Sequence, residues 1–211
     1  METWMFTAGE TIPDRWRACL ERLPADRCDI YADPRYCATW LEWEEGTAVA
    51  LWDTFDGVEF LYCFLLKPLP MALDAHWRHD AQSFYGYGGI VTSAPASPEA
   101  FARFNDAVDQ WMRAHGVVAE FVRQHPLLHQ EPLLARRAEY RCVRTNVYAT
   151  PPAEAIAALD SATRRNIAKA MRSGVRIERW DASDGIDMFA RLYERTAVRL
   201  GMDAFYRFPR E

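Results

Sequence analysis

The stretch Thr47-Ala-Val-Ala-Leu-Trp-Asp-Thr-Phe-Asp-Gly-Val-Glu-Phe-Leu-Tyr-Cys-Phe-Leu-Leu66 decides the fold. It consists of two apolar segments, 47–52 and 58–66, and the Asp56-Gly57 pair between them is a strong signal for a tight hairpin turn. The second segment is apolar almost throughout, which is typical of a strand covered on both faces. We therefore expect a sheet that grows around this hairpin and is buried on both sides.

Further helices and strands are predicted on either side of the hairpin. A helix is expected over 13–23, and a second begins at Pro34, where Asp33 can cap the first turn, and closes at Gly46. After the hairpin we expect a polar loop over 74–82 and strands that end at Thr92 and that cover 117–122, 143–149 and 175–180. Helices are expected over 98–115, 152–159, 160–174 and 183–200, and a short helix or an irregular segment over 127–137. The helix over 183–200 is expected to bury Ile186, Phe189, Leu192, Tyr193 and Thr196.

This order of elements is typical of an α/β fold, more narrowly of an α+β mixed sheet. Pro151-Pro152 is the expected boundary between a domain of residues 1–150 and a second of residues 151–211.

The composition is that of a globular protein, because half of the 211 residues are apolar and 13% are aromatic. No run approaches the ~20 apolar residues of a membrane span, and the N-terminus has no signal-peptide pattern, so we expect no transmembrane segment and a cytoplasmic location. The five cysteines include no Cys-x-x-Cys pair and are expected to be reduced, mostly buried thiols. The pairs His76/His79 and His125/His129 have no cysteine or acidic cluster beside them, so no metal site is expected.

Basic residues are concentrated in one part of an otherwise acidic chain. Residues 1–135 hold 10 Lys/Arg and 20 Asp/Glu, whereas residues 136–179 hold 10 and 4. This predicts one localised surface for anions and not a general DNA binder. Arg164 and Arg165 begin a helix, where the helix dipole disfavours cations, so they indicate an external phosphate or carboxylate. Lys169 shares a face with Arg165. The alternative is an amphipathic helix with a solvated basic side.

A second informative stretch is Ser83-Phe-Tyr-Gly-Tyr-Gly-Gly-Ile90. Glycine lets a ligand or another chain approach the backbone closely, and tyrosine combines a flat apolar body with a polar tip. We therefore expect Tyr85, Tyr87, Gly88 and Gly89 to line a substrate-binding cleft. The alternative is a glycine-bent strand whose aromatic side chains only pack.

Polar side chains follow the strand predicted over 117–122. Ligands of α/β sheets often bind at the carboxyl ends of strands, where Glu120, Arg123 and His125 fall. Glu120 interrupts an apolar strand and is expected to be partly desolvated, so Glu120 or His125 is the candidate catalytic acid or base and Arg123 a candidate substrate-binding residue. The alternative is a Glu120–Arg123 ion pair that holds the loop. The sequence contains no Gly-x-Ser-x-Gly or P-loop motif, so nucleophilic catalysis by serine or cysteine is not indicated.

Three stretches, in this order, resemble the FemAB-type proteins: Phe84-Tyr-Gly-Tyr-Gly-Gly89, Glu120-Phe-Val-Arg-Gln-His-Pro-Leu-Leu128 and Arg164-Arg-Asn-Ile-Ala-Lys-Ala-Met-Arg-Ser-Gly-Val175. The later Leu192-Tyr193…Thr196 and Phe205-Tyr206…Phe208 pieces fit the same pattern. The resemblance implies two GNAT-like halves that face a cleft, the first over 1–150 and the second starting at residue 151. A family member would continue beyond Glu211, so the second half is expected to be incomplete.

The resemblance also implies a function. The family includes peptidoglycan-bridge enzymes and other acyltransferases, so the expected reaction moves an acyl or aminoacyl group to an amine of a cell-envelope precursor or another small acceptor. The implied donor is an acyl-CoA or an aminoacyl-tRNA, although the chain lacks the Arg/Gln-x-x-Gly-x-Gly/Ala loop with which ordinary GNAT enzymes hold CoA. In this hypothesis Tyr85 and Tyr87 line the acceptor channel. Arg164, Arg165 and Lys169 hold phosphates of the donor or the acceptor. Glu120 or His125 accepts the proton.

Two other interpretations stay open. One is a non-catalytic module that binds a nucleotide-sugar or a peptide, and the other is an inactive, truncated relative. An unfinished second half would expose an apolar face, so self-association is a further expectation. The acyltransferase hypothesis requires that Tyr87 and Arg165 line the same cleft.

Overall fold

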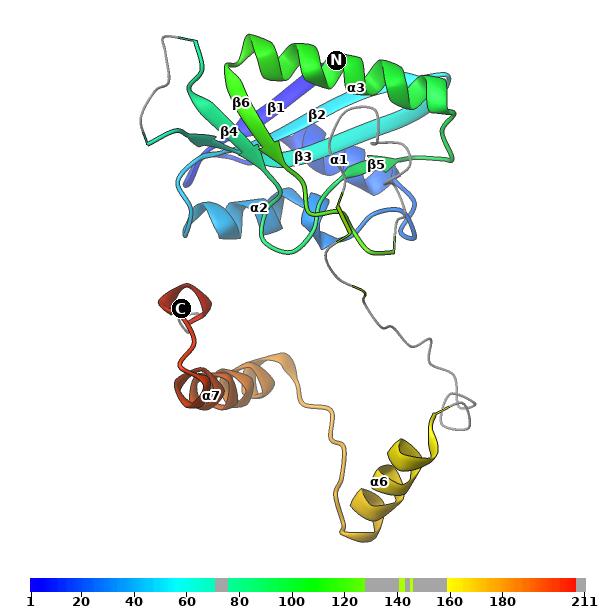
Figure 1. Cartoon of the computed structure of the whole chain (residues 1–211), viewed down its shortest axis with the longest axis vertical. Helices are drawn as coiled ribbons and strands as arrows, with labels where there is room; N and C mark the ends of the chain where they lie inside the picture. Colours follow the sequence, from blue (N-terminus) through cyan, green and yellow to red (C-terminus); the bar gives the residue numbers. More distant parts are fainter. Residues whose placement is uncertain (71–75, 128–140, 143–144, 146–158, 208–211) are drawn as a thin grey trace. The chain divides into compact units, whose positions relative to one another are not determined.

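The computed structural model describes residues 1–70, 76–127, 141–142, 145 and 159–207 (Figure 1). The chain divides into two compact units, Met1–Asn146 and Val147–Glu211, and each is described by itself. The short helix or irregular segment predicted over 127–137, the helix predicted over 152–159 and the strand predicted over 143–149 lie almost wholly outside the described residues.

The first unit is built on one mixed sheet. Its strands are β1 (Glu2–Phe6), β2 (Thr47–Phe55), β3 (Val58–Pro68), β4 (His79–Gln82), β5 (Ile90–Thr92) and β6 (Val117–Phe121). They lie in the order β1-β2-β3-β4-β6, and β5 pairs with another part of β3. All pairs are antiparallel except β4 and β6, which run parallel. The α/β class with a mixed sheet, predicted from the sequence, is confirmed at this level.

The predicted hairpin lies inside this sheet. β2 and β3 pair without interruption from Thr47 opposite Leu66 to Phe55 opposite Val58. Asp56 and Gly57 make the turn with φ angles of 52° and 78°. Two consecutive positive φ angles are the geometry of a type I′ turn, which explains the Asp-Gly pair at this point.

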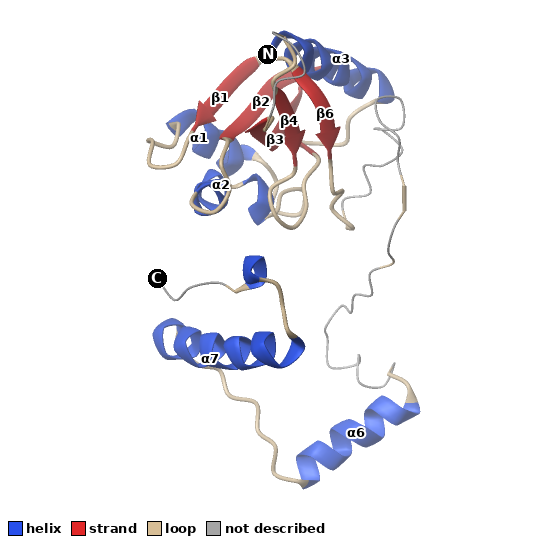
Figure 2. Ribbon diagram, turned by 60° about the vertical axis from the view of Figure 1, so that its left-hand side comes forward, coloured by secondary structure: helices blue, strands red, loops and turns tan. Residues whose placement is uncertain are grey.

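Helices cover both faces of the sheet (Figure 2). Helices α1 (Asp14–Arg22) and α2 (Pro34–Leu41), with the 3-10 turn η1 (Ile30–Ala32), lie on one face, and α3 (Pro98–Ala114) lies on the other. Successive side chains of strand β3 point to opposite faces of the sheet, so this strand contributes to the cores on both faces. Its residues Leu61, Cys63 and Leu65 pack with α1 and α2, and its residues Phe60, Tyr62 and Phe64 pack with α3. The prediction that both faces of this strand are covered is confirmed.

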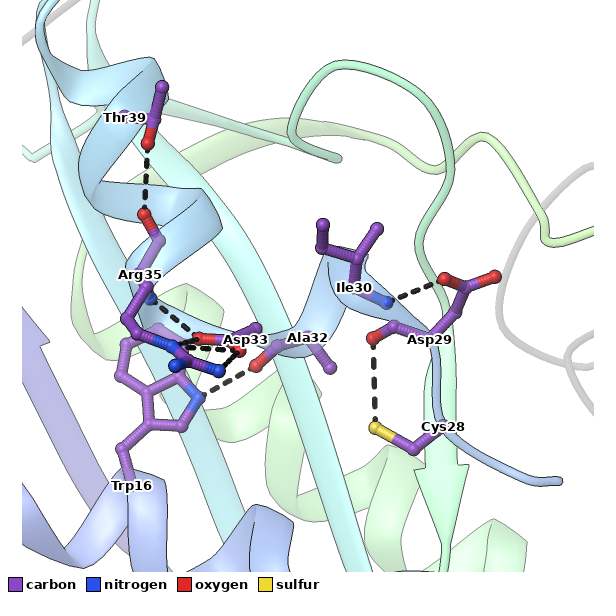
Figure 3. A network of polar contacts seen from close by, with 8 residues as sticks. All are labelled: Trp16, Cys28, Asp29, Ile30, Ala32, Asp33, Arg35 and Thr39. Carbon is purple, nitrogen blue, oxygen red and sulfur yellow. Dashed lines mark hydrogen bonds and ion pairs between the residues drawn. The ribbon is translucent and has the colours of Figure 1, made fainter. Parts of the chain in front are cut away.

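Helix α2 begins where the sequence predicts. The Asp33 carboxylate accepts the backbone N–H of Arg35 at 2.8 Å, and Pro34 occupies the first helical position. The same carboxylate also accepts the Arg35 guanidinium (Figure 3). The helix ends at Leu41, earlier than the predicted stop at Gly46.

Two strands of the sheet are not predicted by the sequence analysis. In β1, Trp4 and Phe6 are buried and alternate with more exposed residues, which is the signal that could have found this strand. Strand β4 lies within 74–82, so the polar loop predicted there is wrong for His79–Gln82. Ala81 is the only buried residue of β4, and the strand exists because its backbone pairs with β3 on one side and β6 on the other.

The described part of the second unit consists of α6 (Ser161–Arg172), α7 (Ala182–Leu200) and the 3-10 turn η2 (Ala204–Tyr206). Asp160 caps α6 by accepting the backbone N–H of Thr163 at 2.9 Å, and Gly201 ends α7 with a φ of 60°. The helices predicted over 160–174 and 183–200 are therefore confirmed.

Two expectations for the second unit are wrong. The segment 175–180 forms no strand, since the described residues of this unit provide no strand for it to pair with, and Ile177 is fully exposed. The predicted buried face of α7 is also open, with Ile186, Phe189 and Leu192 exposed by 64%, 68% and 53%. Within the described ranges, no helix combines the length and the apolar composition that crossing a bilayer requires.

Candidate functional site

The glycine–tyrosine stretch and the segment after β6 meet side by side. The backbone N–H of Gly88 donates to the Arg123 carbonyl at 2.8 Å, and the N–H of His125 donates back to the Gly88 carbonyl at 3.2 Å. Upstream, the N–H of Ser83 donates to the Phe121 carbonyl at 2.9 Å. The predicted site residues Gly88, Arg123 and His125 are therefore brought together by backbone pairing that continues past the ends of β4 and β6.

Gly86 allows a close approach of this stretch to the ring of Tyr31. Its φ is 97°, and a Cβ at this position would lie 2.2 Å from Cε1 of Tyr31. Both the backbone conformation and the lack of space therefore require glycine. The guanidinium of Arg123 donates to the Gly86 carbonyl at 3.5 Å, which ties the turn to the segment after β6.

Aromatic rings form one wall beside this stretch. The ring of Tyr31 lies edge-on to those of Tyr36 and Tyr87, with centroids 5.5 Å apart in each pair. Tyr85 stacks on Trp40 at 4.7 Å, and its carbonyl accepts the Tyr36 hydroxyl at 2.8 Å. The predicted Tyr85 and Tyr87 thus pack on aromatic residues of η1 and α2. Tyr31 was not among the predicted site residues, although the spacing of the aromatic residues over 31–40 is a signal that could have indicated it.

His125 is paired with a carboxylate that the sequence analysis also missed. Its Nε2 lies 2.9 Å from Oδ2 of Asp29, and its Nδ1 accepts the backbone N–H of Leu127 at 3.2 Å. An imidazole that accepts at Nδ1 carries its proton on Nε2, so these contacts fit the neutral ring that donates to Asp29. The other carboxylate oxygen of Asp29 caps η1 by accepting the N–H of Ile30 at 2.6 Å (Figure 3).

These segments border a partly open recess, which is lined by Asp29, Tyr31, Ala32, Cys63, Gly88, Gly89, Val91 and His125. Its cavity volume is about 20 Å³, which is enough to hold at least one water molecule. The walls are mainly apolar, and the charged group at the edge is the Asp29 carboxylate, whose side chain is 47% exposed.

The second catalytic candidate, Glu120, lies on the opposite face of the sheet. Its carboxylate accepts the Tyr62 hydroxyl at 2.6 Å, and Tyr62 belongs to the core under α3. The recess borders Cys63, which belongs to the core under α1 and α2. Of the two candidates for proton transfer, His125 therefore borders the recess and Glu120 is held on the α3 side.

Four cysteines lie on the recess side of the sheet. Cys19 and Cys37 are fully buried, Cys63 is nearly so, and Cys28 is half-buried. Burial raises the pKa of Cys19 to about 12 and that of Cys28 to about 11, and it also raises the pKa values of Cys37 and Cys63. All are free thiols, as the sequence predicts, and so high a pKa makes them poor nucleophiles and metal ligands.

The basic candidates belong to the second unit. Arg164, Arg165 and Lys169 are exposed on α6, and the guanidinium of Arg164 donates to the Leu159 carbonyl at 2.5 Å. These side chains are accessible to an anion in solvent. In the part of the chain that the structure describes, no group of three or more His, Cys, Asp or Glu side chains is placed to hold a metal ion.

Comparison with protein-family models, with curated proteins and with solved structures finds no match to this chain.

Proposed function

We propose that the chain is an acyltransferase of the FemAB/GNAT type, in which residues 1–150 form a GNAT-like half. Its reaction would transfer an acyl or aminoacyl group to an amine of a cell-envelope precursor or another small acceptor. The observation that carries the proposal is the recess, because Gly88, Gly89 and His125 border it and Tyr87 packs on two of its walls, Tyr31 and His125. These residues come from two of the three stretches that resemble the family.

The recess has groups that acyl transfer to an amine needs. The amine must lose a proton before it attacks, and a positioned imidazole is the usual acceptor. His125 borders the recess with its ring fixed between Asp29 and Leu127. In the proposed reaction Nδ1 exchanges the 3.2 Å contact with Leu127 for the amine and takes its proton, while Asp29 keeps the ring oriented and stabilises the imidazolium that forms. The amine forms the new amide as the thioester or ester bond of the donor breaks, and the imidazolium gives its proton to the departing CoA thiolate or tRNA ribose oxygen.

The donor in this proposal is an acyl-CoA or an aminoacyl-tRNA, both of which present phosphates and are found in the cytoplasm. Arg164, Arg165 and Lys169 on α6 are exposed and would hold those phosphates by charge-assisted hydrogen bonds. Glu120 stays a candidate base only for a substrate that reaches the α3 side of the sheet, since its carboxylate is engaged there by Tyr62.

One observation favours a second candidate, a non-catalytic module that binds a nucleotide-sugar or a peptide. Both ring nitrogens of His125 already have partners, so the ring as it stands serves to hold Asp29 and the chain after β6 in place. If His125 kept both of these hydrogen bonds when a ligand bound, the recess would hold the ligand without any proton transfer to the ring.

A thermal-shift screen of the full chain separates the candidates. Acetyl-CoA, UDP-sugars and peptidoglycan stem peptides are added singly at concentrations well above micromolar. A ligand present at 100 times its Kd stabilises the folded state by about 2.7 kcal/mol, enough for a shift of several degrees in Tm. The acyltransferase proposal predicts shifts with acetyl-CoA or the stem peptide, followed by transfer of the labelled acyl group to the amine. Shifts with UDP-sugars alone, without transfer, would favour the binding module.

A further inference from the structure

We propose that residues 161–180, called the basic segment below, bind the surface of an anionic phospholipid bilayer. The segment consists of helix α6 and the residues that follow it as far as Trp180. Its cationic side chains would contact lipid phosphates, and its exposed apolar side chains would enter the layer between the headgroups and the acyl chains. The inference goes beyond the proposed function and does not depend on acyl transfer.

The basic segment is opposite in charge to the chain as a whole. It holds six Lys/Arg and one Asp/Glu, a net charge of +5, whereas the whole chain has a formal net charge of −5. The cationic residues are Arg164, Arg165, Lys169, Arg172, Arg176 and Arg179. Each Lys or Arg close to an anionic leaflet strengthens binding by roughly fivefold. The charge of the segment is therefore complementary to that of an anionic membrane.

The basic segment also leaves apolar side chains uncovered. No residue of α6 is buried. Met171 and Val175 are exposed by 72% and 62%, Trp180 by 48%, and Ile177 is fully exposed. Apolar side chains among arginines are typical of segments that lie in the bilayer interface, where tryptophan is enriched. Both kinds of side chain in the segment thus have a place at a membrane surface.

The helical part of the segment separates these two kinds of side chain. Ile167 and Met171 are four residues apart and share one side of α6. Arg165, Lys169 and Arg172 follow the i, i+4, i+7 spacing and share another. A helix with an apolar side and a polar side rich in Lys and Arg lies flat in the interface, with the apolar side toward the acyl chains.

Other occupants account for only part of these observations. A second copy of the chain would bring the same +5 charge against the segment, and like charges repel. Single-stranded nucleic acid would match the charge, but its bases bind by stacking on aromatic rings. The exposed side chains of Met171, Val175 and Ile177 are aliphatic and offer no such ring. The bilayer is the occupant that uses both the charge and the aliphatic side chains.

The experiment is flotation of the full chain with lipid vesicles, without any acyl donor. One set of vesicles is pure phosphatidylcholine, and in the other about a third of the lipid is phosphatidylglycerol. We expect the wild type to bind the anionic vesicles at least tenfold more tightly than the neutral ones. We also expect most of this difference to disappear at about 0.5 M salt, because salt screens the attraction between exposed charges.

The charge of the segment is tested by a double variant, Arg172→Gln with Arg176→Gln. Its matched control, Arg191→Gln with Arg195→Gln, removes two exposed arginines from α7. None of these four residues is proposed to hold the acyl donor. We expect the first variant to weaken binding to anionic vesicles roughly thirtyfold, as two lost contacts of about fivefold each imply. The control should change binding less than about threefold.

The apolar contribution is tested by Val175→Ser with Ile177→Ser. Val198→Ser with Leu200→Ser is its control, because these two side chains on α7 are exposed by 61% and 62%. We expect at least a tenfold loss of binding to anionic vesicles from the first pair, since each aliphatic side chain gains by leaving water. The control pair should have little effect, and circular dichroism checks that all variants stay folded.

The wild type alone can overturn the proposal. Equal binding to neutral and anionic vesicles, no binding to either, or binding to tRNA without binding to vesicles would do so, as would an equal loss in a double variant and its control. The outcome is distinct from that of the acyltransferase proposal. Vesicle binding without acyl transfer would support the membrane surface and remove the acyltransferase, and acyl transfer without vesicle binding would do the reverse.

Discussion

His125 and Asp29 are joined by a hydrogen bond of 2.9 Å across 96 residues of sequence. The bond links the segment that follows β6 to the start of η1, and the cap that Asp29 makes on Ile30 holds the carboxylate in place from the other side. Because the neighbouring Tyr31 ring packs on Tyr87 and on His125, the pair also fixes the aromatic wall. The contact between His125 and Asp29 therefore helps to fix the shape of the recess.

His125→Ala should lower the free energy of unfolding by about 1–3 kcal/mol, because it removes two hydrogen bonds and the packing of a largely buried ring. His125→Gln should recover part of the loss, since the glutamine amide can still donate to Asp29. Urea unfolding monitored by tryptophan fluorescence measures both. An alanine variant as stable as the wild type would mean that the pair does not hold the two segments together.

Gly86→Ala should destabilise the chain by more than Gly9→Ala. Both glycines have a positive φ, 97° and 79°, so both substitutions carry the backbone cost of about 1 kcal/mol. Only at position 86 would the new methyl group collide with Tyr31, because nothing lies within 4 Å of a Cβ at position 9. We expect a further loss of about 1–3 kcal/mol and displacement of the Tyr31 ring. Equal Tm values for the two variants would show that the close approach to Tyr31 is unnecessary.

The buried thiols should react slowly with iodoacetamide in the folded protein. At pH 8 a thiol with a pKa of about 11, as for Cys28, has on the order of a hundredfold less thiolate than an ordinary cysteine. The sign of the shift predicts that labelling of Cys28 accelerates as pH rises toward that value, with Cys19 lagging behind because its pKa is raised to about 12. Mass spectrometry of peptides after timed labelling gives the rates, and the exposed Cys142 is the internal reference. Equally fast labelling of all five at pH 8 would contradict the burial described here.

Arg165→Ala should weaken binding of a phosphate-bearing donor several-fold without changing Tm. Arg165 is exposed on α6, so its removal costs little folding energy. Arg199→Ala, at the exposed end of α7, is the control for a lost surface charge. Filter binding of radiolabelled tRNA and calorimetry with acetyl-CoA are the measurements. A drop in Tm for Arg165→Ala would show that Arg165 supports the fold. An equal loss of binding with Arg199→Ala would show that the attraction is a nonspecific effect of surface charge.

Turn residues, capping residues and apolar patterns in the sequence predicted the elements that depend mainly on their own residues. The type I′ turn at Asp56-Gly57, the cap at Asp33 and the covered strand β3 all follow from short-range chemistry, and the structure has each of them. Strand β4 could not be found in this way, because its polar residues become a strand only through pairing with β3 and β6. The opposite case is the segment 175–180, whose apolar and polar residues alternate as in a strand. It forms no strand, because no strand among the described residues pairs with it.

The candidate site was predicted only in part for the same reason. Gly88, Gly89 and His125 stood out because glycines beside tyrosines and a histidine after a strand are locally unusual, and they do border the recess. Asp29 carries no such signal, because its importance arises from a contact made 96 residues away. Glu120 was grouped with His125 by closeness in sequence, yet the alternation of side chains along β6 engages it with Tyr62 on the α3 side of the sheet.

The most direct test of the account is transfer of a labelled acetyl group from acetyl-CoA, or of an amino acid from aminoacyl-tRNA, to Nα-acetyl-lysine amide by the full chain. The account predicts transfer by the wild type, and a loss of about a hundredfold or more in kcat for His125→Gln, which keeps the bond to Asp29 but cannot take the proton. No transfer by the wild type with either donor, or an unchanged kcat for His125→Gln, would contradict it.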